Sequence, residues 1–163
     1  MQTGIILAGG NSTRMGIDKS MINMNVKRLA KEMRISGCDS IIVMCGTLDR
    51  AKMFEENCVL DAANTLAESL LHVVSELKGV IQLAPCDAYL ADAELFKSID
   101  GVPLDDNGLR QPLLAKFNTD EVLINSTKVL EVFKNINSCP GGIKARNINT
   151  QDELKEIEHL LTK

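Results

Sequence analysis

Short, mostly apolar segments separated by longer helical stretches limit the folds open to this chain more than any other feature. Three such segments lie at 4–8, 40–45 and 80–84. They lack the alternation of a half-exposed strand and are typical of strands buried on both faces. The intervening residues are long enough for crossover connections, which predicts βαβ units and a mostly parallel sheet. We therefore expect an α/β fold: one three-layer α/β/α domain spanning 1–163, with a Rossmann-like sheet.

Apolar spacing and breaker residues predict the other elements. Helices are expected at 26–35, 48–56, 63–77, 91–99 and 126–136, with a final helix from Thr150. Further extended segments are expected at 57–60, 113–117 and 145–148. Loops are expected at 9–20, 101–107 and 139–142. Ser126 is a suitable N-cap for the helix that follows it.

The composition is that of an ordinary globular protein and argues against two classes of partner. Of the 163 residues, 45% are apolar and 25% are charged, and the net charge is −4. A mildly acidic chain lacks the positive field that attracts nucleic acid or anionic membranes. Aromatic residues make up only 3%, so stacking surfaces for single-stranded nucleic acid are not expected.

The cysteines and the apolar runs indicate a cytoplasmic location. There are five cysteines, an odd number, and no pair has the C-x-x-C spacing. This argues against a disulfide framework or a zinc ribbon and suits a reducing compartment. No apolar run approaches the roughly 20 residues that span a bilayer. We expect a soluble protein with no membrane contact.

The segment after the first strand has the features of a phosphate-binding loop. Gly9 and Gly10 let the backbone approach a ligand closely, so that successive N–H groups can surround an anion. Arg14 and Lys19 add fixed positive charge. Lys19 stands three positions after Gly16, so the segment is not a Walker A motif. Backbone donors together with two cations favour a polyphosphate ligand.

The same segment resembles the L-A-G-G-x-S-x-R-M-G-x-D-K signature of the MobA-like family of molybdenum cofactor guanylyltransferases. All fixed positions are present: Leu7, Ala8, Gly9, Gly10, Ser12, Arg14, Met15, Gly16, Asp18 and Lys19. The resemblance implies a fold of the nucleotide-diphospho-sugar transferase type and a nucleotidyl transfer reaction. It implies a set of nucleotide-binding residues: Leu7, Ala8, Gly9, Gly10, Ser12, Arg14 and Lys19. It also implies that Gly16 lies on the acceptor side.

Asp87 follows a buried strand and is the candidate metal ligand. A carboxylate at the carboxyl end of a strand, across from a phosphate loop, suits Mg²⁺, which takes one or two carboxylates plus substrate phosphates. The resemblance implies that the aspartate of a Cys-Asp pair, here Cys86-Asp87, binds the metal and contributes to the nucleotide site. Tyr89-Leu90 stands where the family commonly has proline. A turn or a helix cap is the alternative role of Asp87.

Asp61 follows the expected strand 57–60 and has two candidate roles. The resemblance implies a place in the nucleotide site. The Gly-Pro-Leu-Ala-Gly run that usually follows in the family is here Asn64-Thr65-Leu66-Ala67-Glu68, without the Gly-Pro. Capping the next helix is the alternative.

Two segments in the second half resemble the acceptor side of the family. Residues 108–115 resemble G-x-x-Q-P-L-x-A, which implies acceptor contacts from Gln111 and Pro112. Residues 147–150 read Asn-Ile-Asn-Thr, like the family's N-x-N-T, and alternation places Asn147 and Asn149 on one face. A turn into an edge strand and a capped helix are the alternative readings of these two segments.

The expected chemistry is attack of an acceptor phosphate on the α-phosphorus of a nucleoside triphosphate, with loss of pyrophosphate. An ionised phosphate needs no strong general base, so alignment and charge neutralisation are the main demands. We expect Arg14, Lys19 and Asp87 to be the catalytic residues, with Mg²⁺ on Asp87. The resemblance implies GTP as donor and a molybdopterin-type cofactor, containing Mo or W, as acceptor.

Two alternatives remain open. The small size and the Asn-Ile-Asn-Thr segment also suit a guanylyltransferase acting on adenosylcobinamide phosphate. The missing Gly-Pro suits a degenerate protein that binds a nucleotide without transferring it. In either case we expect a monomer or weak homo-oligomer with transient contacts to proteins of the cofactor pathway.

Overall fold

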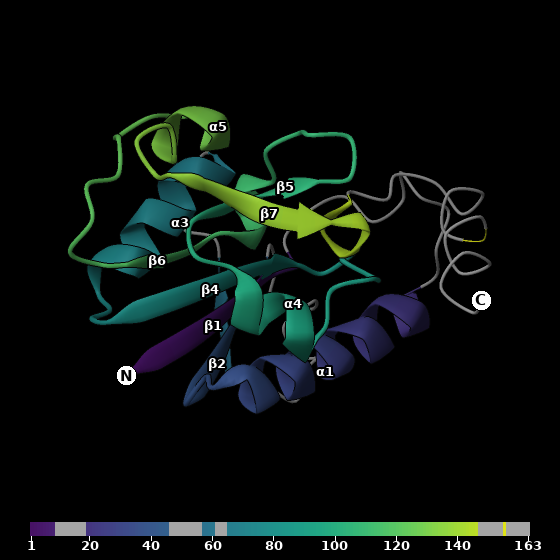
Figure 1. Ribbon diagram of the computed structural model, residues 1–163. Coiled ribbons are helices and arrows are strands. Elements are labelled where there is room, and N and C mark those ends of the chain that lie inside the picture. Colours follow the sequence, from purple (N-terminus) through teal and green to yellow (C-terminus); the bar gives the residue numbers. More distant parts are fainter. Residues whose placement is uncertain (9–18, 46–56, 61–64, 147–154, 156–163) are drawn as a thin grey trace.

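A five-stranded sheet forms the centre of the computed structural model, which describes residues 1–8, 19–45, 57–60, 65–146 and 155 (Figure 1). The strand order is β3-β2-β1-β4-β6. The bounds are β1 Gln2–Leu7, β2 Ser40–Cys45, β3 Asn57–Leu60, β4 Val80–Pro85 and β6 Lys116–Asn118. β1 pairs in parallel with both β2 and β4, and β2 with β3, while β6 is antiparallel to β4. The expected mostly parallel sheet is therefore confirmed.

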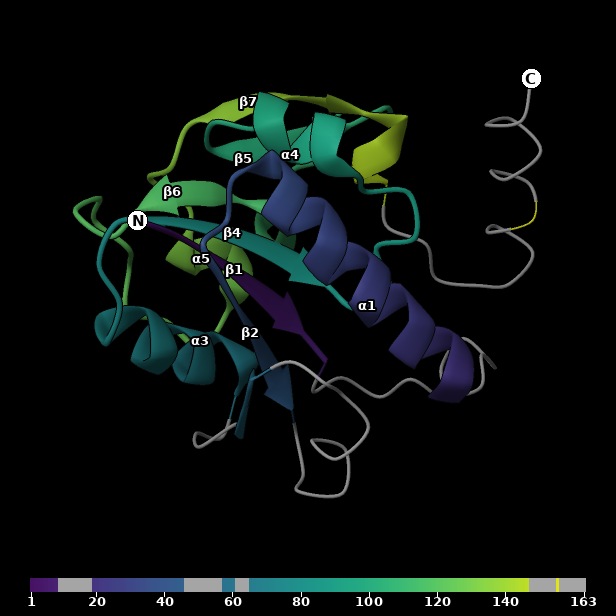
Figure 2. The same cartoon turned by 90° about the horizontal axis from the view of Figure 1, so that it is seen from below.

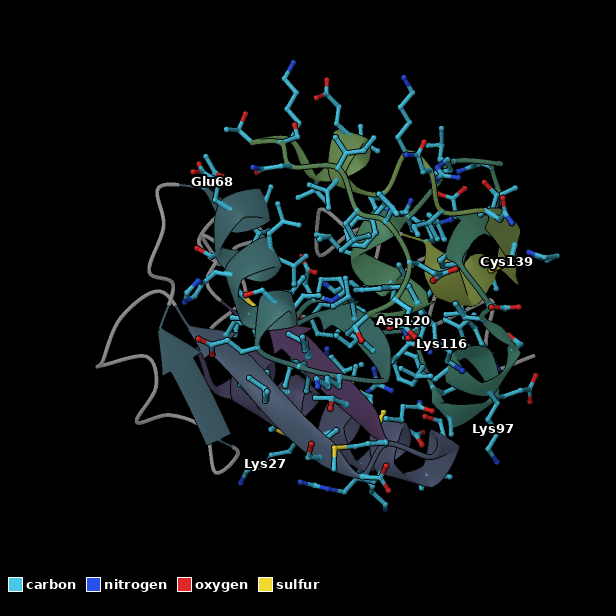
Figure 3. The ribbon with its side chains drawn as sticks, turned by 90° about the vertical axis from the view of Figure 1, so that its left-hand side faces the viewer. Lys27, Glu68, Lys97, Lys116, Asp120 and Cys139 are labelled. Carbon is cyan, nitrogen blue, oxygen red and sulfur yellow. The ribbon has the colours of Figure 1, made fainter. Side chains whose placement is uncertain are left out.

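Helices cover both faces of the sheet (Figure 2). α1 (Lys19–Ser36) and α4 (Ala93–Ser98) pack on one face, while α3 (Leu66–Ser75) and the short α5 (Val129–Val132) pack on the other. Glu68 of α3 and Lys27 of α1 mark the two opposite sides in the side-chain view (Figure 3). The three-layer α/β/α arrangement matches the expected fold.

Alternate residues of β1 enter two separate cores. Ile6 packs with the α1 side, and Ile5 and Leu7 pack with the α3 side. Gly4 lets α1 come close to the strand, because a Cβ there would lie 2.6 Å from the Met33 Sδ. Burial on both faces explains why the residues at the end of the strand, Ile5, Ile6 and Leu7, are all apolar.

A second, two-stranded sheet lies where the sequence predicted loops at 101–107 and 139–142. β5 (Val102–Asp105) pairs in parallel with β7 (Ser138–Gly142). The sequence did not predict these strands because each contains a proline, Pro103 or Pro140, and proline is unusual in a strand except at an edge. Both strands of a two-stranded sheet are edge strands, so both prolines are tolerated here.

Several predicted elements have different bounds. α1 begins at Lys19, well before the predicted 26–35, so residues 19 and 20 are not part of a loop. The predicted helix 126–136 is reduced to the single turn of α5. Ser126 does not cap it, because its Oγ accepts from the Lys128 N–H two residues on and donates to Glu131, which forms a local turn.

The predicted strand 113–117 and the first residue of the predicted extended segment 145–148 also differ, while residues 147 and 148 lie outside the described residues. Pro112–Leu114 forms the 3₁₀ helix η2 before β6 begins, with the proline at its first position. Ile143–Ala145 forms a second 3₁₀ turn, η3. The predicted helix 48–56 lies outside the described residues, as does the final helix except for Lys155, which is helical.

Among the described residues, no helix is long and apolar enough to cross a membrane. Three cysteines in this part of the chain, Cys38, Cys86 and Cys139, are free thiols.

Candidate active site

The strand order reverses beside β1, and this is where α/β sheets bind ligands. The chain passes from β1 outwards to β2 and β3, then returns across the sheet to form β4 on the other side of β1. Ligands of such sheets bind beyond the carboxyl ends of the strands at this switch point. The two segments that leave β1 and β4 there are the signature segment, from Ala8 onwards, and the turn that contains Asp87.

Backbone hydrogen bonds continue past the strand ends and hold these two segments together. The Ala8 N–H donates to the Met44 carbonyl at 2.8 Å. The Cys86 N–H donates to the Leu7 carbonyl at 3.0 Å. The first residues of the signature segment therefore lie directly beside the residue that precedes Asp87.

The predicted nucleotide residues are only partly within the described chain. Leu7 and Ala8 are buried at the end of β1, and Lys19 is the first residue of α1. Seven other predicted site residues lie outside the described residues: Gly9, Gly10, Ser12, Arg14, Gly16, Asn147 and Asn149. Asp61 also lies outside them, immediately after the end of β3. The roles given to all of these stay predictions.

Helix capping was the alternative role of Asp61 and Asp87, but other residues cap the helices that follow them. Asp92 caps α4, accepting from the Leu95 N–H at 2.9 Å. Thr65 caps α3, accepting from the Glu68 N–H at 3.2 Å. Asp87 lies in a turn instead, where its own carbonyl accepts from the Tyr89 N–H at 2.9 Å. Its carboxylate is therefore not needed to end or start a helix.

The Asp87 carboxylate is half-buried and has no cationic partner among the side chains that the structure describes. Burial raises the pKa of this carboxyl, and only its own backbone N–H opposes the shift. A desolvated carboxylate is stabilised by a cation. In the described residues, no three His, Cys, Asp or Glu side chains form a metal cluster. A single carboxylate suits a divalent cation that completes its shell with phosphate and water.

Asp87→Asn is expected to raise the thermal stability of the metal-free protein at neutral pH. Since the pKa of the carboxyl is raised in the folded state, its ionised form opposes folding once the pH exceeds that value. The gain should disappear below about pH 4, where the carboxyl is neutral in both states. Thermal unfolding in EDTA across this pH range measures it. The exposed Asp120→Asn is the control, and a loss of stability at neutral pH would mean that the carboxylate has a favourable partner.

Two polar residues of α1 contact the Asp87 turn and were not predicted from the sequence. Asn25 is 6% exposed, and its Nδ2 donates to the Cys86 carbonyl at 2.7 Å. Arg28 donates to the carbonyls of Ala88 and Ala91. The only feature of the sequence that could have indicated this role is their i,i+3 spacing, which places two polar side chains on the otherwise apolar inner face of the helix.

Tyr89 also lies beside the candidate metal ligand. Its hydroxyl is buried and has no hydrogen-bond partner among the described residues. Desolvation, together with the neighbouring Cys86 and Asp87, raises its pKa to about 12. The hydroxyl therefore stays protonated and is a hydrogen-bond donor at neutral pH.

Gln111 and Pro112 lie toward the same end of β4. β6 runs antiparallel to β4, with Lys116 opposite Gln82, so the residues before Lys116 run toward the carboxyl end of β4. The Gln111 Nε2 donates to the Asp105 carboxylate at 3.0 Å, and Pro112 starts η2. Gln111 thus holds the loop after β5, and its predicted acceptor contact is not tested.

Residues 4–100 match the MobA-like NTP transferase domain. The chain belongs to this family. The match includes the signature segment and Asp87. The reaction class is therefore nucleotidyl transfer, and a divalent metal is typical of such enzymes. No curated protein sequence matches the chain.

Solved structures show the fold of this MobA-like transferase. A nucleotidyl transferase from Methanothermobacter superimposes with a TM-score of 0.70 at 16% identity, over 99% of this chain and 98% of the other. A protein from Aquifex aeolicus gives 0.68 at 15%, over 91% and 94%. A 4-diphosphocytidyl-2C-methyl-D-erythritol synthase from Anaerococcus prevotii gives 0.60 at 13%, over 99% and 98%. All share the nucleotide-diphospho-sugar transferase type of fold.

Proposed function

We propose that this MobA-like transferase moves GMP from GTP to the phosphate of a molybdopterin-type cofactor, containing Mo or W, and releases pyrophosphate in a Mg²⁺-dependent reaction. The observation that carries the proposal is the pairing of a complete signature segment with a half-buried carboxylate. The Cys86 N–H and the Leu7 carbonyl join the two at the strand ends. In this proposal the signature segment binds the donor phosphates and Asp87 binds a metal ion next to them.

The donor side of the site consists of backbone N–H groups and two cations. In the proposal, the amides of Gly9 and Gly10 surround the phosphates, while Arg14 and Lys19 neutralise the β- and γ-phosphates. Ser12 completes the loop, and Asp61 contacts the nucleotide beyond the end of β3. Lys19 begins α1, so its backbone belongs to a helix that packs along the central sheet.

Asp87 faces the metal in this proposal. Its raised pKa and the lack of a cationic partner in the described chain support that role. A bound divalent cation neutralises charge on the α-phosphate. The attacking group is a phosphate that is already ionised, so the chain needs no general base and can rely on positioning.

The acceptor side is proposed to include Gly16, Gln111, Pro112, Asn147 and Asn149. Gln111 and Pro112 lie toward the carboxyl end of β4, which supports this assignment. Gln111 is oriented by Asp105, which also accepts from the N–H groups of Asn107 and Leu109. A loop held in this way can present a fixed surface to an acceptor.

Asp87→Ala is expected to abolish metal-dependent pyrophosphate release while the protein stays folded, because the metal loses its protein ligand. Pyrophosphate production from GTP, with and without acceptor, measures the effect, and circular dichroism checks the fold. The control is the exposed Asp120→Ala, on the chain beyond β6 and near the amino end of β4. Full activity of Asp87→Ala would overturn the metal assignment.

Lys19→Ala is expected to weaken triphosphate binding by roughly tenfold to a hundredfold, the size of a lost charge-assisted hydrogen bond. Acceptor binding should change far less. Titration calorimetry with GTP and with the acceptor separates the two effects. Lys31→Ala, an exposed lysine further along α1, is the matched control. Equal losses for both ligands would contradict the placement of Lys19 on the donor phosphates.

The base and the acceptor are tested by a nucleotide screen. GTP with Mg²⁺ is expected to raise the melting temperature more than ATP, CTP or UTP, since a ligand at 100 times its Kd stabilises by about 2.7 kcal/mol. Preference for another base would place the chain in a different branch of the transferases. Turnover with adenosylcobinamide phosphate instead of the pterin would favour the second acceptor. Binding without turnover on either would favour a degenerate nucleotide-binding protein.

A further inference from the structure

Arg28 uses its guanidinium to hold the segment that carries Asp87. Its Nη1 donates to the Ala91 carbonyl at 2.6 Å and its Nη2 to the Ala88 carbonyl at 2.8 Å. Its Nε donates to the Asn25 Oδ1 at 2.9 Å. The planar group thus bonds in three directions at once, a geometry that lysine cannot reproduce.

Asn25 extends this contact to the residue next to Asp87. Its Oδ1 is occupied by Arg28, which fixes the orientation of the amide. Its Nδ2 then donates to the Cys86 carbonyl at 2.7 Å in a buried position. The two side chains together bond three carbonyls, at 86, 88 and 91. We call this pair, Asn25 and Arg28, the α1 clamp.

Burying the charged and polar groups of the α1 clamp costs free energy that a contact serving only to pack a helix on a turn would not require. Burial lowers the pKa of Arg28, which shows that its charge is partly desolvated, although Glu32 and Asp92 oppose the shift. Apolar side chains of similar volume often stabilise a buried contact as well as a buried charge does. The gain from polar groups is a fixed geometry for the backbone they bond.

The segment is also held by the bond from the Cys86 N–H to the Leu7 carbonyl and by the buried side chains of Ala88 and Ala91. Within the turn, the Ala88 N–H donates to the Pro85 carbonyl and the Tyr89 N–H to the Asp87 carbonyl. The Asp87 side chain itself has no cationic partner in the described residues. The direction in which this carboxylate points therefore depends on how the backbone on each side of it is held.

We propose that Asn25 and Arg28 are positioning residues that set the Asp87 carboxylate for a divalent cation, an inference that rests on the proposed function. Bonding at 86 and 88 fixes the backbone on both sides of Asp87. The same helix begins at Lys19, about 9 Å along its axis from Asn25 at 1.5 Å per residue. α1 thus connects the proposed phosphate-binding lysine rigidly to the proposed metal ligand.

The test measures Mn²⁺ binding by electron paramagnetic resonance, with the nucleotide that stabilises the unaltered protein most. Arg28→Lys keeps the charge but loses the fork, and Asn25→Asp loses the donor to Cys86. Each is expected to weaken Mn²⁺ binding by about tenfold to a hundredfold, the usual effect of removing a group that orients a metal ligand. In the metal-free protein, hydrogen exchange should accelerate at the amides of residues 86–91.

Arg110→Lys is the matched control. Arg110 also bonds backbone carbonyls, at Phe133 and Ile136, together with the Ser138 hydroxyl, but it holds the β7 side of the molecule. Its replacement should lower stability without changing Mn²⁺ affinity. This separates positioning from a general loss of stability.

The outcomes distinguish the two levels of the proposal. If Asp87→Ala does not weaken Mn²⁺ binding, the proposed function of Asp87 fails. If Asp87→Ala weakens it but Arg28→Lys and Asn25→Asp bind Mn²⁺ as tightly as the unaltered protein, the α1 clamp proposal alone is overturned. If Arg110→Lys weakens binding as much as the clamp variants do, the effect is one of stability and the proposal is likewise overturned.

Discussion

The parallel pairing of β1 with β2 on one side and β4 on the other is the constraint on which the site depends. Parallel strands end at the same edge of a sheet, so everything that follows β1 and β4 begins at one place. The ladder continues through the bonds at Ala8 and Cys86, beyond the last strand residues. Ala8 and Asp87 are 79 positions apart in sequence, yet the residues just before them, Leu7 and Cys86, are joined by a backbone hydrogen bond.

The helices on the two faces of the sheet contribute differently to the candidate site. On the α3 side, an apolar cluster that includes Leu70, Val73 and Phe133 packs against the sheet. On the α1 side, the helix adds two polar residues to its apolar contacts, and both bond the segment after β4. Burial of polar groups costs free energy unless every group is paired, and here the Asn25 amide and the Arg28 donors are paired. Asp87 lies between two of the bonded residues, Cys86 and Ala88, and its carboxylate has no cationic partner among the side chains that the structure describes.

The sequence predicted β1, β2 and β4 well because each carries a short run of buried apolar residues between breaker residues. Strands at 40–45 and 57–60 have the predicted bounds. β5 and β7 were missed because Pro103 and Pro140 argue against strands by local rules, while pairing between distant segments decided the outcome. The predicted helix at 126–136 failed for the related reason that Ser126 bonds its own neighbours and Phe133 and Ile136 are held in the core.

The site was predictable only where a motif marks it. The signature segment and Asp87 carry residue types that phosphate and metal chemistry require, and they could be found without a structure. Asn25 and Arg28 could not, because their role comes from carbonyl groups more than 60 positions away in sequence. Backbone acceptors have no residue type, so no pattern in the sequence points to them.

The central claim is that Asp87 and the signature segment form one metal and nucleotide site at the switch point of the sheet. Anomalous scattering from Mn²⁺ in crystals grown with a nucleoside triphosphate tests it most directly. The account predicts one strong peak within coordinating distance of an Asp87 carboxylate oxygen, with the triphosphate along residues 9–19. A nucleotide bound with its metal away from Asp87, or at any other edge of the sheet, would contradict it.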